Sequence, residues 1–197
     1  MASLVLSMAF VKLLVLSILV VLGAQAASAG EINQKVLAEI NLARTNPQGY
    51  AQLLAAQMGN GNDRAVAEAV KFLQKSRPLP PLVPSFGLEQ GAQAHVASQG
   101  PIGGRGHGDN PFSRMERFGR WTGSAGENIY YGTRDARGIV CSLIVDQGVA
   151  DRGHRKNLFS HSFGMAGVAY GYHATYGSMC VIDFAGSFTE RGSLAGL

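Results

Sequence analysis

Three short glycine-bounded blocks in the second half of the chain constrain its fold most strongly. They span residues 104–109, 126–129 and 153–158. Glycine lets the backbone turn sharply, so a histidine beside it can face a cavity instead of lying along a helix. The first and third blocks each carry such a histidine, His107 and His154, and the middle block carries Glu127. We therefore expect these side chains, far apart in sequence, to meet in one cleft.

A single acid interrupts the apolar run between the second and third blocks. Residues 138–149 contain Asp146 and no other charged side chain. A buried charge is costly unless it is paired, so Asp146 needs a partner, and His154 and Arg155 follow it closely. We predict that two imidazoles and two carboxylates converge in the fold. They belong to His107, Glu127, Asp146 and His154.

The N-terminal segment has the features of a secretory signal peptide. Residues 13–22 are apolar except for Ser17, follow Lys12, and precede small-x-small sequences that end at Ala29. A membrane-spanning helix would need about 20 apolar residues without the Lys12 interruption. An uncleaved anchor is the alternative. We expect residues 1–29 to be removed and the protein to be secreted and extracellular.

Length and charge define the class of the remaining chain. Residues 30–197 suit one domain with a real core. The full chain has a formal net charge of +4, and removal of Lys12, the only charged residue before residue 30, leaves +3. This charge is too small to argue for a nucleic-acid partner. We expect a monomer.

The chain has two cysteines, Cys141 and Cys180. In an oxidising compartment a pair of this kind can form one disulfide, and the predicted signal peptide favours that interpretation. Both cysteines also lie in apolar runs, where a free thiol packs like a small hydrophobic side chain. A disulfide and two buried thiols therefore both remain open.

Hydrophobic periodicity predicts helices and strands in an α+β arrangement. Apolar residues at three- and four-residue steps predict helices, and alternation predicts strands. The expected helices are 31–44, 47–58, 63–75, 85–99, a short 112–118, and 135–149. The expected strands are 127–131, 165–172 and 178–185, the last two joined by a hairpin turn at 173–177. Prolines in residues 78–84 make a stiff connector. The result is a set of helices around a small, mostly antiparallel sheet.

The basic side chains have simple structural interpretations. We expect Arg114, Arg117 and Arg120 on the exposed face of a short helix, and Arg155 in a solvated turn. The alternative for the helix face is contact with anionic lipid or a cell-wall polymer, which a net charge of this size supports only weakly.

The other histidines and the tyrosines are assigned less specific roles. His95 is expected to pack on its helix, and His161 and His173 are expected to be exposed in turns. A set of tyrosines either lines an apolar groove or forms cross-strand pairs. They are Tyr130, Tyr131, Tyr170 and Tyr172.

Taken together, these motifs resemble the CAP superfamily of cysteine-rich secretory proteins, antigen 5 and pathogenesis-related 1 proteins, especially its SCP-like extracellular branch. The resemblance rests on Asn41, Arg44, Pro47, His107, Gly126-Glu127-Asn128-Ile129 and Gly153-His154-Arg155-Lys156-Asn157. It implies a three-layer α-β-α sandwich with a cleft lined by two histidines and two acids. Asp146 occupies the position of the second acid, nineteen residues after Glu127, and is one methylene shorter than the usual glutamate.

The resemblance also implies a set of functions. It implies a non-enzymatic binding module for a lipid, a sterol or a cell-surface or cell-wall ligand. Some family members hold a divalent cation between the two histidines, so His107 and His154 are candidate zinc ligands. The alternative is a metal-assisted hydrolase in which the cation activates water and Glu127 acts as base. The chain has neither a serine elbow nor a local two-histidine motif of the metalloprotease kind.

Overall fold

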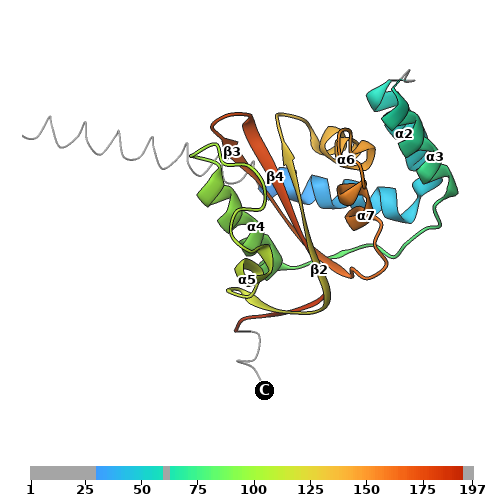
Figure 1. Ribbon diagram of the computed structural model, residues 1–197. Helices are drawn as coiled ribbons and strands as arrows, with labels where there is room; N and C mark the ends of the chain where they lie inside the picture. Colours follow the sequence, from blue (N-terminus) through green and yellow to red (C-terminus); the bar gives the residue numbers. More distant parts are fainter. Residues whose placement is uncertain (1–29, 60–62, 193–197) are drawn as a thin grey trace, which may run out of the picture.

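A four-stranded mixed sheet lies between two layers of helices (Figure 1). The structure is a computed structural model that describes residues 30–59 and 63–192, so the expected signal peptide lies outside this part. The strands are β1 (Val83–Pro84), β2 (Gly119–Tyr131), β3 (Met165–His173) and β4 (Gly177–Glu190). Their order is β1-β3-β4-β2, with β1 parallel to β3 and the other pairs antiparallel. Within the described ranges, no helix has the length and hydrophobicity needed to span a membrane.

Helices cover both faces of this sheet. One layer consists of α4 (Phe86–Gln99) and α5 (Pro111–Met115). The helix at residues 30–45 packs with the other layer, whose further members are α2 (Pro47–Met58), α3 (Arg64–Lys75), α6 (Ala136–Val145) and α7 (Gly153–Leu158). The predicted α+β class and the three-layer sandwich are confirmed.

The alternation of side chains along the central strands builds a core on each face of the sheet. In β4, Cys180, Ile182 and Phe184 join the cluster that contains the helix at residues 30–45, α2, α3 and α6. The intervening Met179 and Val181 join the cluster under α4. Successive side chains of a strand point to opposite faces, so one apolar run supplies two cores. This explains why residues 179–182 form a continuous apolar run.

Helix starts agree with the sequence prediction because local caps fix them. The side chains of Asn46, Asp63, Ser85 and Asp135 accept hydrogen bonds from backbone N–H groups in the first turns of their helices. The end of α6 is different. It stops at Val145, not at residue 149, because Asp146 adopts the left-handed conformation with φ of 54°. The strand β2 begins at Gly119, well before the predicted residue 127.

Two motif residues of the first helix hold the proline-rich connector. The Arg44 guanidinium is buried and donates to the carbonyls of Pro80, Leu158 and Ser160 at 3.1, 2.8 and 3.1 Å. The Asn41 side chain accepts from the Leu82 N–H at 2.7 Å and donates to its carbonyl at 3.0 Å. These bonds place the end of the connector beside β3, where it forms the short strand β1. Asn41 and Arg44 therefore stabilise the fold.

The cysteines are free, so the favoured disulfide is wrong. Cys141 lies on α6, and its Sγ is 3.7 Å from the hydroxyl of Tyr50 on α2. Cys180 is buried in the middle of β4. Burial raises the pKa of Cys141 to about 11 and that of Cys180 to about 12. The two thiols pack as apolar groups and stay protonated at neutral pH.

Candidate functional site

The first half of the site is a buried ion pair under an exposed histidine. His107 Nδ1 lies 2.7 Å from Glu127 Oε1, and the Arg114 guanidinium binds Oε2 of the same carboxylate. The Glu127 side chain is 1% exposed and that of Arg114 is 4% exposed. Arg114 was expected on an exposed helix face, and that expectation is wrong. The end of α5 turns this side chain inward, because it compensates the charge of Glu127.

In this half of the site, Glu127 and its partners, His107 and Arg114, stabilise each other's charged forms. Burial favours the protonated form of Glu127, but the hydrogen bond from His107 and the charge of Arg114 outweigh it, so the pKa of Glu127 lies below its usual value. The same hydrogen bond raises the pKa of His107, although partial burial opposes it. Glu127 is thus an anion at neutral pH, and His107 keeps its proton to a higher pH than a free imidazole.

The second half repeats the pairing with Asp146 and His154. His154 Nδ1 lies 2.6 Å from Asp146 Oδ1. The other oxygen, Oδ2, accepts from the backbone N–H of His154 at 2.9 Å and from that of Arg155 at 3.4 Å. The left-handed turn at Asp146 folds its buried carboxylate over the start of α7. Asp146 therefore orients His154, and the predicted need for a partner is met.

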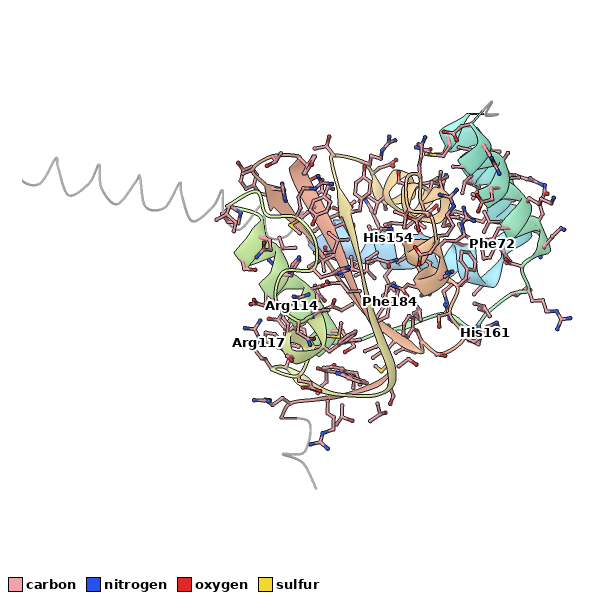
Figure 2. The ribbon with its side chains drawn as sticks, in the orientation of Figure 1. Phe72, Arg114, Arg117, His154, His161 and Phe184 are labelled. Carbon is pink, nitrogen blue, oxygen red and sulfur yellow. The ribbon has the colours of Figure 1, made fainter. Side chains whose placement is uncertain are left out.

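Asparagines join the two motif blocks that carry Glu127 and His154. The buried Asn128 donates to the backbone carbonyl of His154 at 3.0 Å and accepts from Asn157 Nδ2 at 2.9 Å. These contacts tie α7 to β2. Figure 2 labels Arg114 and His154 on opposite sides of β2. Arg114 thus reaches Glu127 of β2 from α5 in one layer, and His154 lies on α7 in the other layer.

Both histidines line one depression along β2. It has a volume of about 520 Å³ and is lined by Arg105, Gly106, His107, Ile129, Tyr131 and His154. An adjoining hollow of about 400 Å³ shares four of these residues and adds others, among them Tyr130, Arg134, Leu143, Val149 and Tyr176. We call the two together the β2 groove. Each histidine uses Nδ1 for its carboxylate, and neither Nε2 has a hydrogen-bond partner among the described residues. The Nε2 atoms are the nitrogens left for a ligand.

Two other histidines hold the loop that forms one wall of the groove. His95 Nε2 lies 3.1 Å from the Gly106 carbonyl, and His173 Nε2 lies 2.8 Å from the Gly104 carbonyl. His173 is fully buried, so the expectation that it is exposed is wrong. Its Nδ1 accepts from the backbone of the β3–β4 turn, and its ring packs 5.1 Å from that of Tyr131. His161 is exposed, as predicted.

The four tyrosines separate into two groups. Tyr130 and Tyr131 line the β2 groove. Tyr170 and Tyr172 line a different hollow of about 880 Å³, between the start of the helix at residues 30–45 and α4. The groove instead gains Tyr176 from the β3–β4 turn.

Arg155 also departs from expectation. It was expected in a solvated turn, but it is buried and bound to Glu68 at 2.8 Å.

The sequence interpretation missed one buried acid of the site. Asp183 is paired with Glu127 in the register of β4 and β2 and is fully buried. Its oxygens have no hydrogen-bond partner in the part of the chain that the structure describes. Burial and the charge of Glu127 raise the pKa of Asp183 well above its usual value. An acid inside the apolar run 178–185 was a usable signal, by the reasoning that singled out Asp146.

Comparison with models of known protein families identifies the family of this chain. A model of the Cysteine-rich secretory protein family, CAP, matches residues 37–184. The chain belongs to this family. Thus the blocks containing His107, Glu127 and His154 all lie inside its CAP domain. No match was found among curated proteins.

Two solved structures that are similar to this CAP protein come from bacteria. One is an extracellular protein containing a SCP domain from Bacillus anthracis str. Ames, with 23% identity and a TM-score of 0.44. The match covers 54% of this chain and 34% of that one. Another is an outer surface protein from Borrelia burgdorferi, with 16% identity, a TM-score of 0.47, and coverage of 57% of this chain and 80% of that one. The match thus spans only about a third of the length of the Bacillus chain.

The donor set fits only part of a metal site. Among residues 30–59 and 63–192, no group of three or more histidine, cysteine or acidic side chains is placed to hold a metal. The two Nε2 atoms would supply two of the four ligands that a zinc ion usually takes. Their carboxylate partners are of the kind that orients metal-bound imidazoles. Any further ligands would have to come from water or from a bound molecule.

Proposed function

We propose that this protein is a secreted binding module that retains a lipid, a sterol or another cell-surface ligand in the β2 groove without chemical turnover. The observation that carries the proposal is the composition of the groove. Two imidazoles with free Nε2 atoms lie beside walls that include Ile129, Leu143 and Val149. A ligand with a polar group and an apolar body matches both parts, because binding sites combine apolar walls with a few oriented polar groups.

The alternative of a metal-assisted hydrolase is less well supported by the geometry. A general base must reach the water that it deprotonates. Both oxygens of Glu127 are already bound by His107 and Arg114, and the side chain is almost fully buried. Both oxygens of Asp146 are likewise engaged. Carboxylates held in this way orient histidines and are poorly placed to accept a proton from water.

A divalent cation is compatible with this function. His107 and His154 would hold it through Nε2, and Glu127 and Asp146 would orient the two rings. When bound, such an ion would supply positive charge for the polar group of the ligand. The protein would contribute the apolar surface that binds the rest of it.

A fluorescent sterol and a fluorescent fatty acid, dehydroergosterol and cis-parinaric acid, test the proposal with two matched tyrosine variants. Tyr176 lines the groove, and Tyr172 lines the hollow beside α4. We expect Tyr176→Ser to weaken retention of the probe and Tyr172→Ser to leave it unchanged. An effect of Tyr172→Ser alone would place the ligand outside the groove and contradict the proposal. Zinc-dependent cleavage of a nitrophenyl ester that is lost in Glu127→Gln would favour the hydrolase.

A further inference from the structure

The positive charge of the β2 groove is not compensated by acids on its surface. Arg105 and Arg134 line the groove and are exposed, and neither forms an ion pair with any residue that the structure describes. Asp146 is the single acid lining the described groove, and its buried oxygens are bound to His154 and to backbone N–H groups. Glu127 lies behind His107 and is paired with Arg114. The surface that a ligand meets is therefore cationic.

Arg105 is held in place before any ligand arrives. Its neighbours in the loop, Gly104 and Gly106, are fixed through their carbonyls by His173 and His95. The N–H of Gly106 also donates to the Tyr131 hydroxyl at 2.8 Å. The Arg105 guanidinium lies over the Tyr176 ring, 5.5 Å from its centre. A prearranged donor loses less conformational entropy on binding than a free side chain does.

We infer that the β2 groove binds an oxyanion, a carboxylate or a phosphate, through the guanidinium of Arg105, beside the Nε2 atoms of His107 and His154. This inference rests on the proposed function, because it names the chemical class of the ligand's polar group. Charge-assisted hydrogen bonds to oxyanions are among the strongest that side chains make. Arg134 adds long-range attraction from the adjoining part of the groove. The apolar walls then receive the rest of the ligand.

The carboxylate partners of the two histidines leave one side of each ring available to the groove. Nδ1 of each ring faces a carboxylate, which leaves Nε2 for the bound molecule. His107 lies beside Glu127 and Arg114, and His154 faces Asp146, with Arg105 and Arg134 along the groove. A bound oxyanion would therefore lie between the guanidinium of Arg105 and the two rings.

Benzoate, with benzyl alcohol as its neutral counterpart, tests the inference by NMR titration of the purified protein, from which metal has been removed by a chelator that is then dialysed away. The carboxylate of benzoate is ionised at neutral pH, whereas benzyl alcohol carries no charge. We expect benzoate to bind about tenfold more tightly than benzyl alcohol, because only benzoate forms a charge-assisted hydrogen bond. Equal binding of the two probes would overturn the inference.

Matched arginine variants locate the site. The Arg105→Gln/Arg134→Gln variant should weaken benzoate binding about tenfold, because it removes one direct donor and one nearby charge. The Arg77→Gln/Arg120→Gln variant carries the same loss of charge at exposed positions outside the groove and should bind like the wild type. If both variants weakened benzoate binding equally, the effect would come from the overall charge of the protein, and the inference would be overturned. Thermal denaturation of each variant checks that the fold is kept.

Vesicles identify the source of the anion and separate this inference from the proposed function. Binding to phosphatidylcholine vesicles that contain phosphatidic acid, in competition with benzoate, assigns the anion to a lipid headgroup. Benzoate binding without vesicle binding assigns it to a free molecule. Vesicle binding that benzoate does not reduce contradicts the groove site. If Tyr176→Ser leaves sterol and fatty-acid retention intact while benzoate still binds, the proposed function fails and the oxyanion site stands.

Discussion

Glu127 and Asp183 stand directly opposite one another on β2 and β4, and both side chains are sealed from solvent. Two carboxylates in such positions repel each other when both are ionised. Arg114 binds Glu127 and so favours the charge on that member of the pair. Burial and the charge of Glu127 raise the pKa of Asp183 well above its usual value, so a proton shared by the pair is favoured on Asp183.

Replacing this acid by its neutral isostere tests the assignment. A raised native pKa means that Asp183 contributes its full stability below the unfolded pKa and loses it as the pH rises toward the native pKa. We expect Asp183→Asn to change the free energy of unfolding by no more than about 1 kcal/mol near pH 4. As the pH rises, the variant should become more stable relative to the wild type. Urea denaturation at several pH values measures this difference. A constant loss at every pH would mean that Asp183 is ionised in the folded protein.

Removing the buried cation should be far more damaging. Arg114→Gln leaves the Glu127 carboxylate buried without its charge partner, which typically costs about 3–5 kcal/mol. The matched variant Arg117→Gln changes an exposed arginine three residues later and should stay within about 0.5 kcal/mol of the wild type. Urea denaturation at neutral pH measures both. If both variants changed the free energy of unfolding by similar, small amounts, Arg114 would have to be exposed, which contradicts its buried ion pair with Glu127.

The contrast between Arg114 and the helix caps explains what the sequence predicts well. The side chain of a helix cap such as Asp63 accepts a hydrogen bond from the first turn of its own helix. The start of the helix is therefore determined by residues that are neighbours in sequence. The spacing of apolar residues in the helices is local in the same sense. The burial of Arg114 depends on β2, and the burial of His173 depends on the loop at Gly104. Such contacts between distant segments are absent from local patterns.

The residues of the candidate site show the same difference between local patterns and contacts of distant segments. The glycine-bounded blocks and the lone acid in an apolar run identified the two histidine–carboxylate pairs. The third carboxylate, Asp183, followed the same rule but was hidden by the apolar residues around it. Arg105 and Tyr176 gave no signal, because the groove forms only when the loop at residues 104–106 meets the β3–β4 turn.

The free cysteines can be counted directly. Both thiols are buried and have raised pKa values, so they should react slowly with a thiol reagent in the native protein. Unfolding in denaturant without reductant should expose two reactive thiols per chain. The native protein and the denatured, reduced protein serve as controls. Two thiols only after reduction would mean that Cys141 and Cys180 are bridged.

The account depends most on His107 and His154 sharing one ligand site through their Nε2 atoms. Long-range proton–nitrogen NMR spectra of the histidine rings, recorded during a benzoate titration at about pH 6, measure this directly. We predict that the Nε2 signals of both rings shift along one binding curve, while those of exposed His161, outside the groove, stay fixed. A response from only one ring, or equal responses from all the histidines, would contradict a shared site.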